Sequence, residues 1–158
     1  MFLRGRGLSS VCRPLLVLLL GVLSLETGFG CSGNTAKYPE LHARDGSVTV
    51  DLSGIGAENG RFHSYRSPSG KQINIFVYRE SSGVPHAVLD ACHTCYRWKK
   101  GYVLEGKEVV CLKCDMRFKL DTLAHGAGSC VPIALTTLQR GDTLIISAAE
   151  LDAGGRFF

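Results

Sequence analysis

Five cysteines in the second half of the chain have the spacing of metal ligands. Two Cys-x-x-Cys pairs, Cys92/Cys95 and Cys111/Cys114, are separated by 15 residues, and Cys130 follows the second pair. A Cys-x-x-Cys turn places two thiolates on one side of a tight loop, and two such turns can surround a zinc ion, a single iron or an iron–sulfur cluster. Cuprous copper also prefers thiolates. The spacing therefore predicts a metal or cluster site and leaves its identity open among Fe, Zn, Cu and iron–sulfur.

Two other uses of the cysteines compete with metal binding. In an oxidising compartment paired cysteines usually form disulfides, but five is an odd number and leaves one thiol over. A thiol–disulfide oxidoreductase places its Cys-x-x-Cys pair at a helix N-terminus. No helical pattern follows Cys95 or Cys114, so we rank the redox dithiol below a metal site. Cys130 is either a further ligand or a small residue packed beneath the site.

Aromatic and histidine residues near the cysteines are candidates for the surroundings of the site. An imidazole can ligate, donate a hydrogen bond to a ligand or face water, and aromatic rings can limit solvent access. The candidates are His93, Tyr96, Tyr102, Phe118 and His125. No catalytic residues are predicted, because the sequence contains no nucleophilic serine motif, phosphate-binding loop or His-Glu zinc-protease motif. A metal-binding or electron-transfer protein is favoured over an enzyme.

The segments that must position the first cysteine pair have the pattern of strands. Apolar residues alternate with polar ones over 47–52 and again over 61–65, as in half-buried strands. The run 72–78 is the densest in β-branched and aromatic residues, which predicts a central strand. A short apolar segment, 87–89, leads directly into Cys92.

The second pair is predicted to follow a hairpin. Segments 102–104 and 107–111 flank a Glu-Gly turn, and further strands are expected at 118–120 and 143–146. A 3.6-residue period is present only at 147–151. The predicted fold class is mainly β, a small antiparallel β domain with two cysteine-knuckle loops.

The N-terminus has the composition of an export signal. Three arginines precede an apolar run at 15–25, which is shorter than the about 20 apolar residues that cross a bilayer core. Gly30 and Cys31 resemble the end of a bacterial lipobox, so Cys31 is a candidate lipidation site. Ordinary cleavage nearby and an uncleaved anchor are the alternatives. We expect a protein of the cell envelope, membrane-anchored on the periplasmic or outer face.

Length and composition fit a single hydrophobic core. We expect a signal at 1–31, a linker at 32–46, the metal-binding domain at 47–151 and a loose tail at 152–158. The formal charge of +4 falls to +2 from Cys31 onward, where 15 basic and 13 acidic residues remain. Nucleic acid is therefore not predicted as a partner.

A local basic cluster lies beside the first cysteine pair. Arg97, Lys99 and Lys100 lie within four positions of one another. A solvated loop face is the simpler interpretation, and a docking patch for an acidic redox partner is the alternative.

The cysteine motifs and their neighbours resemble a known family. The motifs are DACHTCY at 90–96, KGY at 100–102, VCLKC at 110–114 and GSCVP at 128–132, with Phe118 between the last two. In this order and spacing they resemble the FtrD-like membrane iron–sulfur protein family. That family usually has Gly-Gly-Cys-Asn-Pro as its last motif, and here a serine and a valine replace the second glycine and the asparagine.

The resemblance implies a cofactor and a role. It implies that the five cysteines hold an iron–sulfur cluster or a metal, and that the protein carries electrons in iron uptake or respiration with a redox partner protein in the cell envelope. Members are often fused to membrane segments that this sequence does not contain, so the resemblance covers the cofactor domain, with an N-terminal lipid or signal anchor as the membrane attachment. A non-redox zinc- or copper-binding module is the alternative, ahead of a thiol–disulfide oxidoreductase.

A more distant likeness links the second half to Rieske domains. Cys111 and Cys114, Phe118, the glycine-rich loop and Pro132 are similar to the second cluster loop and the proline loop of those domains. Two histidines there replace two cysteines on one iron, whereas here Cys114 stands at one histidine position and Cys95 near the other. The likeness implies a Rieske-like fold whose all-thiolate cluster has a lower potential.

Overall fold

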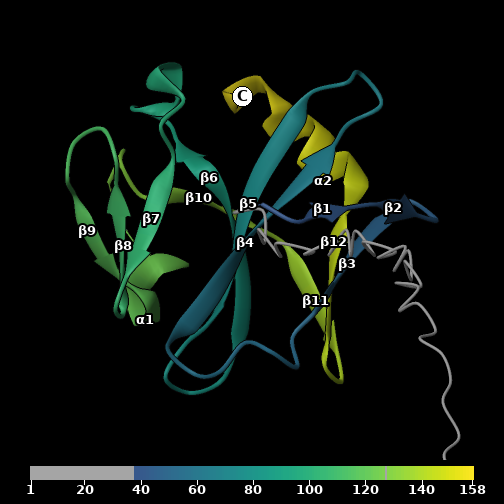
Figure 1. Cartoon of the computed structure of the whole chain (residues 1–158), viewed down its shortest axis with the longest axis horizontal. Helices are drawn as coiled ribbons and strands as arrows, with labels where there is room; N and C mark the ends of the chain where they lie inside the picture. Colours follow the sequence, from purple (N-terminus) through teal and green to yellow (C-terminus); the bar gives the residue numbers. More distant parts are fainter. Residues whose placement is uncertain (1–37, 127) are drawn as a thin grey trace, which may run out of the picture. The chain divides into compact units, whose positions relative to one another are not determined.

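The structure is a computed structural model that describes residues 38–126 and 128–158 (Figure 1). The predicted export signal, Cys31 and the first part of the predicted linker lie outside the described residues. No helix in the described part of the chain is long and apolar enough to span a membrane.

Strands dominate the described part and form three sheets (Figure 1). The first sheet contains, in order, β1 (Glu40–Leu41), β4 (Asn59–Arg66), β5 (Gln72–Arg79), β6 (Pro85–Cys92) and β10 (Pro132–Leu135). The second contains β11 (Thr137–Arg140), β12 (Thr143–Ser147), β3 (Ser47–Asp51) and β2 (Ala43–Arg44). The third contains β7 (Tyr102–Glu105), β8 (Glu108–Cys111) and β9 (Arg117–Lys119). The strand pairs are antiparallel apart from β1 with β4, which confirms the predicted mainly β, antiparallel class.

The helical elements are short. They are α1 (Leu120–Leu123), α2 (Ala148–Gly154) and the single 3-10 turns η1 (Tyr96–Trp98) and η2 (Gly155–Phe157). The helical period at 147–151 is confirmed by α2. Leu120, predicted in a strand, instead begins α1, where it is buried.

The run at 72–78 is the central strand of its sheet, as predicted, and it separates two hydrophobic cores. Successive side chains of a strand point to opposite faces. Ile73, Ile75 and Val77 accordingly face one core, while Phe76 and Tyr78 face the other. A strand buried on both faces reads as a continuous apolar run rather than an alternating one, and this explains the composition of β5.

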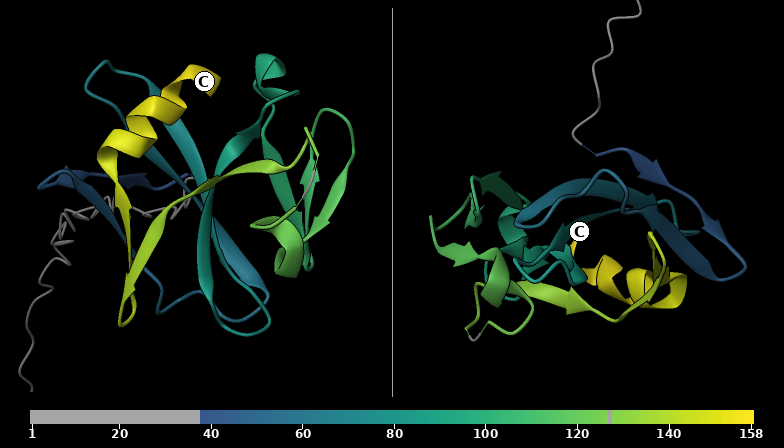
Figure 2. Two further views of the ribbon diagram at one scale, coloured as in Figure 1. Left: turned by 180° about the vertical axis from the view of Figure 1, so that it is seen from behind. Right: turned by 90° about the horizontal axis from the view of Figure 1, so that it is seen from below.

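The aliphatic core lies between the first sheet and the second sheet with α2 (Figure 2). Its buried members are Val48, Val50, Leu52, Ile55, Tyr65, Ile73, Ile75, Val77, Ala87, Leu89, Ala91, Leu144, Ile146, Ala148, Leu151 and Phe157. The strands predicted at 47–52 and 143–146 are confirmed as β3 and β12, and they place Val48, Val50, Leu144 and Ile146 in this core.

The cysteine core lies on the other side of the first sheet, under the third sheet and α1 (Figures 1 and 2). Its buried members are Phe76, Tyr78, Val88, Cys92, Cys95, Tyr102, Val109, Cys111, Leu120 and Leu123. The predicted hairpin is confirmed as β7 and β8, which bring Tyr102 and Cys111 opposite each other.

The structure differs from the prediction at both ends of the domain. Within the predicted linker 32–46, β1 pairs with β4 and β2 pairs with β3. The predicted tail 152–158 is the end of α2 and η2, with Phe157 buried against the aliphatic core. A loose tail has few apolar side chains, whereas this segment ends in two phenylalanines. Burying apolar side chains of this kind stabilises the folded state. Strands β10 and β11 were not predicted.

Candidate metal centre

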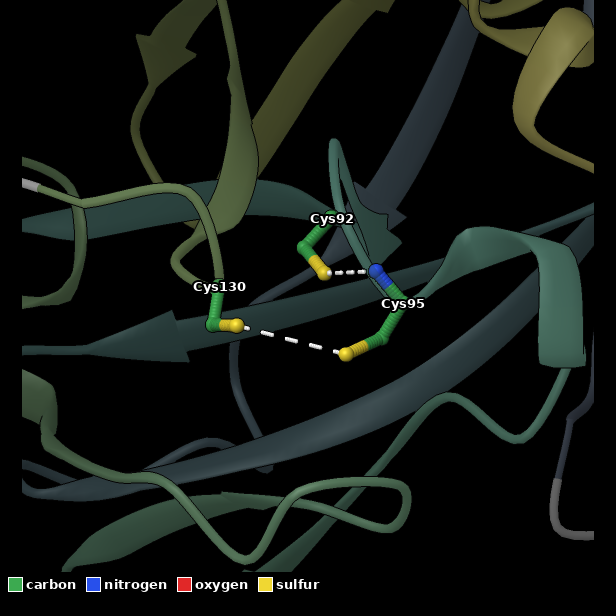
Figure 3. Close-up of side chains that lie close together, drawn as sticks. All are labelled: Cys92, Cys95 and Cys130. Carbon is green, nitrogen blue, oxygen red and sulfur yellow. Dashed lines mark hydrogen bonds between the residues drawn. The ribbon is translucent and has the colours of Figure 1, made fainter.

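The first cysteine knuckle forms where β6 ends. The two-residue period of β6 places Cys92 on the same face as Val88, toward the cysteine core. The chain then turns so that the Cys95 backbone N–H donates a hydrogen bond to Cys92 Sγ at 3.0 Å (Figure 3). The turn continues into η1, which ends at Lys99 in the left-handed region (φ 50°). The knuckle is thus held by a buried strand on one side and a 3-10 turn on the other.

The second knuckle forms in the same way at the end of β8. Cys111 is the last residue of the strand, and its backbone N–H donates to the Met116 carbonyl at 2.9 Å. Asp115 adopts a left-handed φ of 57°, which reverses the chain into β9. Cys114 lies on the exposed side of this turn.

Cys130 comes from a third segment, between α1 and β10. The Tyr102 hydroxyl donates to the Cys130 carbonyl at 2.6 Å, and the Thr94 hydroxyl donates to the Ser129 carbonyl at 3.1 Å. Pro132 pairs with Cys92 at the start of β10, an edge strand, where a residue without a backbone N–H is tolerated. The loop is therefore attached to both the first knuckle and β7.

The five sulfur atoms converge. Two groups, Cys92/Cys95/Cys130 and Cys95/Cys111/Cys114, each have all their sulfurs within 4.8 Å of one another. Cys95 Sγ lies 4.0 Å from Cys130 Sγ, and Cys114 Sγ lies 3.7 Å from it. Figure 3 shows the sulfurs of Cys92, Cys95 and Cys130 directed toward one space. Cys95 belongs to both groups, so the knuckles and the third loop form one site.

The donor set fits a thiolate-bound metal. Sulfurs placed tetrahedrally about 2.3 Å from one ion lie about 3.8 Å apart, and the closest contacts here are 3.7 and 4.0 Å. All five thiols are free. Soft sulfur donors alone suit zinc, cuprous copper, a single iron or an iron–sulfur cluster. The residues that would hold such a group are the five cysteines.

Burial is uneven across the site. Cys92 and Cys111 are 1% and 2% exposed, whereas Cys114 is exposed and Cys130 is half-buried. Burial, with the neighbouring thiols, raises the pKa of the Cys95 thiol above its ordinary value. The site therefore has a buried floor and one edge open to solvent at Cys114.

Backbone hydrogen bonds favour the thiolate forms in the second knuckle. A backbone hydrogen bond from Met116 lowers the pKa of Cys114 below the usual value. Burial raises the pKa of Cys111, although backbone hydrogen bonds from Lys113 and Cys114 oppose it. Donors aimed at sulfur stabilise its negative charge, so this turn favours the thiolate of Cys114, whereas burial outweighs the donors at Cys111.

A cavity of about 490 Å³ opens onto the buried sulfurs of Cys92, Cys95 and Cys111. Its lining also contains the basic residues Lys99, Lys100 and Lys113 and the aromatic residues Tyr96 and Phe157. The cavity wall thus places three lysines and two aromatic rings around the same hollow as three of the cysteines.

Asp90 is a site residue whose role the sequence prediction missed. This buried carboxylate accepts hydrogen bonds from the Tyr102 backbone N–H at 2.6 Å and from the Tyr38 hydroxyl at 2.7 Å. A Cβ on Gly101 (φ 67°) would lie 2.5 Å from the Asp90 carboxylate, so only glycine allows this approach. A buried acid two residues before a cysteine pair, inside an apolar strand, is the signal that identifies it.

The aromatic and histidine residues predicted to surround the site differ in their burial and in what they contact. Tyr102 is buried between the knuckles, and Phe118 packs against the cysteine core. Tyr96 and the exposed His93 both pack on Phe157, each with ring centroids 5.3 Å apart. His125 is exposed, and neither histidine joins a group of three or more potential ligands among the described residues.

The geometry bears on the redox-dithiol alternative. A single 3-10 turn follows Cys95, where no helix was predicted, but no α-helix starts there. Burial raises the Cys95 pKa. The pKa of Cys114 is lowered, but strand β9 follows its turn, whereas a reactive dithiol lies at a helix N-terminus. The arrangement suits metal ligation better than thiol exchange.

Comparison with known proteins agrees with the motifs. No curated protein matches the sequence. The model of the family described as membrane iron-sulfur containing protein, FtrD-like, matches residues 55–158, about two thirds of the 158-residue chain. The match contains all five converging cysteines, and the chain therefore belongs to the FtrD-like family.

Proposed function

We propose that the protein binds an iron–sulfur cluster or a metal ion on its five cysteines and serves as an electron carrier. The observation that supports this proposal is the convergence of five free thiols from three separate segments into two overlapping groups with sulfurs within 4.8 Å. The description of its family as iron-sulfur containing supports a cluster in particular.

When bound, a cluster of this kind supplies a one-electron redox centre. The chain contributes the environment of that centre. Cys92 and Cys111 would hold it with their buried thiols, and a backbone hydrogen bond in the second knuckle stabilises the thiolate of Cys114. Tyr102 excludes water above the buried sulfurs and keeps the Cys130 loop in place. Donors to sulfur and solvent exposure are the features by which a protein tunes a cluster's potential.

The cellular setting is part of the proposal. The family is described as a membrane protein family, and the N-terminal sequence has the features of an export or lipoprotein signal. We place the protein in the cell envelope, attached to the membrane through its N-terminus, with electron transfer serving iron uptake or respiration.

Lipidation of Cys31 is tested with radiolabelled palmitate. Incorporation by the full chain that is absent from Cys31→Ala supports lipidation. Incorporation that persists in Cys31→Ala contradicts it.

A non-redox metal-binding module is the second candidate. The sulfur separations of 3.7 and 4.0 Å match ligands around one ion, and four thiolates around a single zinc form a common structural site. In that case the metal stabilises the fold and carries no electrons.

One experiment separates the two candidates. Full-length protein isolated anaerobically is assayed for iron, zinc, copper and acid-labile sulfide, and its absorption spectrum is recorded before and after dithionite. The proposed carrier has iron, a visible charge-transfer band and bleaching on reduction. A colourless protein with one zinc per chain and no dithionite response supports the second candidate. Cys95→Ser, which removes the sulfur shared by both groups, abolishes binding in either case, while the exposed control Leu138→Ser retains it.

A further inference from the structure

We infer that the solvent edge of the metal site is a docking surface for an acidic electron-transfer protein. The surface, which we call the knuckle surface, consists of Trp98, Lys99, Lys100, Leu112, Lys113 and Met116. This inference rests on the proposed electron-carrier function and adds the partner class and the residues that recognise it.

Exposed apolar side chains are concentrated on the two knuckles. Of the five large apolar side chains that are exposed among the described residues, three belong to the knuckle surface: Trp98 at 52%, Leu112 at 44% and Met116 at 50%. Tryptophan and methionine are enriched at the centres of protein interfaces. The apolar part of a partner contact therefore lies at the metal site and not elsewhere on the described surface.

The two knuckles form one continuous surface. Lys113 Nζ lies 4.7 Å from the centroid of the Trp98 ring, and the Leu112 backbone N–H donates to the Gly101 carbonyl at 3.0 Å. Cys114, the exposed cysteine, lies between Leu112 and Met116 in the same turn. A partner seated here contacts the side of the site that is nearest to solvent.

The charges on this surface are mainly positive. Lys99, Lys100 and Lys113, with the adjoining Arg97, are exposed, and none of them forms an ion pair within residues 38–126 and 128–158. The second knuckle also carries one exposed acidic residue, Asp115, so four basic residues stand against one acidic residue. By contrast, the nearby Arg117 is bound to two glutamates of the third sheet. A surface with a net positive charge attracts a partner of opposite charge and orients it during encounter. The complementary partner is acidic.

Two other occupants fit less well. A second copy of this chain presents the same positive patch, and like charges facing each other across an interface oppose association. An anionic membrane would attract the lysines and accept Trp98, but it would cover the exposed edge at Cys114 and block the shortest exit for an electron. An acidic protein satisfies both the charge and the position of the exposed cysteine.

The transfer itself is a one-electron step. The reduced site loses one electron, the partner's acceptor gains one, and neither an atom nor a proton has to move between the proteins. Recognition therefore requires only contact at the knuckle surface.

Two forms of one redox protein provide the test. Native cytochrome c is cationic, and its lysine-succinylated form is anionic with the same haem. Full-length protein, reduced with dithionite and desalted anaerobically, is mixed with each form, and reduction of ferric haem is followed by absorbance. We expect the anionic form to react about tenfold faster at low salt, and this preference to disappear at high salt.

Charge-reversed variants locate the effect. Lys99→Glu combined with Lys113→Glu should abolish the preference for the anionic form. The matched control, Arg44→Glu with Arg140→Glu, changes net charge equally on the second sheet and should keep it. Equal losses in both variants would mean that net charge alone acts, and would overturn the docking surface. The docking surface would also be overturned if the protein bound phosphatidylglycerol vesicles and the Lys99→Glu, Lys113→Glu variant did not.

A binding measurement separates this inference from the proposed function. Zinc-loaded, ¹⁵N-labelled protein is titrated with succinylated cytochrome c, and the amide shifts at 97–100 and 112–116 are compared with those of β11 and β2. Shifts at the knuckles support docking even if the native protein does not respond to dithionite, a result that rejects the carrier function alone. Amide shifts on β11 and β2, or no amide shifts at all, reject the docking surface. A site that dithionite reduces would still support the carrier function.

Discussion

The two cores on either side of the first sheet differ in what completes them. None of the described cysteines belongs to the aliphatic core, and its two sheets and α2 close it with side chains such as Leu144 and Ile146, both 0% exposed. In the cysteine core, three of the ten buried members are Cys92, Cys95 and Cys111. Apolar burial stabilises the first core without a ligand, while the second core is completed by thiols that bind a metal in their thiolate form, so that metal binding adds to its stability.

This difference suggests a division of labour in the fold. The central strand presents Ile75 and Val77 to one side and Phe76 and Tyr78 to the other, so a single sheet supports both cores. The aliphatic core packs against β6 and fixes the position of its end. The knuckle that begins at this end is therefore held in place. A site built on strand ends is held more accurately than one built on loops. We therefore expect the cysteine core, and not the aliphatic core, to depend on the metal.

Metal removal gives the largest expected effect and addresses that contrast directly. A ligand at 1,000 times its dissociation constant stabilises the folded state by about 4 kcal/mol. Hydrogen exchange is measured by mass spectrometry on loaded protein and on reduced, metal-free protein. Amides of β7, β8 and β9 should lose most of their protection without metal, while those of β3 and β12 should keep theirs. Equal loss in both sheets would show that the cores unfold as one unit.

Leu144→Ala should destabilise the aliphatic core. Leu144 is fully buried, and truncating such a residue destabilises a protein by about 2 to 5 kcal/mol. The loss in free energy of unfolding, measured by urea denaturation, should be similar in loaded and metal-free protein because none of the described cysteines belongs to this core. The control is Leu138→Ala on β11, which is 52% exposed and should change stability by about 0.5 kcal/mol or less. A Leu144→Ala loss that depended on metal would contradict the separation of the cores.

Tyr102→Phe should affect the cysteine core more weakly. It removes the hydroxyl that donates to the Cys130 carbonyl, a bond worth about 1 kcal/mol. Loosening a group that orients a ligand lowers metal affinity about 10- to 100-fold. Metal transfer to a competing chelator should therefore be faster, with the folded content by circular dichroism unchanged. Tyr96→Phe is the matched control, because its ring packs on Phe157, and it should leave the transfer rate unchanged. Equal rates of metal transfer in the Tyr102→Phe and Tyr96→Phe variants would show that the Tyr102 hydroxyl does not help to hold the metal site.

Local pattern was sufficient to predict the elements that carry the knuckles. Strands β3, β4, β5, β7, β8 and β12, and parts of β6 and β9, were predicted because apolar runs, period-two alternation and β-branched density depend on neighbouring residues alone. The five cysteines could be grouped from spacing, since each pair lies in one tight turn. The convergence of Cys130 with them followed only from the resemblance, because 15 residues that include α1 separate it from Cys114.

The features that were missed depend on contacts between distant segments. Strand β10 has little alternation of its own and is defined by its pairing with β6, and β1 is defined by β4. Phe157 is buried because Tyr96 and the aliphatic core reach it, which the end of the sequence alone does not reveal. The role of Asp90 likewise depends on Tyr38 and Tyr102, which lie 52 and 12 residues away.

Acidification should give the smallest effect, and it should act on the aliphatic side of the sheet. His63 lies opposite Ile75 on β4, and neither of its ring nitrogens has a hydrogen-bond partner in the described structure. Burial, together with the positive charge of Arg61, lowers the pKa of His63 below its ordinary value of 6.5. Below about pH 6.5 the unfolded chain therefore binds a proton that the folded chain does not, and stability falls as the pH drops through 6.5 toward the folded pKa. Above that range both states are neutral and the effect vanishes.

His63→Gln removes this titration and so tests its location. In reduced, metal-free protein, where the pH dependence of metal binding does not contribute, the wild-type Tm should fall by a few degrees between pH 7.5 and 5.5. The variant should show a shallower decline over the same interval, with its Tm at pH 7.5 as the reference. Because His63 faces the aliphatic core, the exchange protection of β3 and β12 should decline with it. Parallel pH profiles for the two proteins would assign the acid sensitivity to another group.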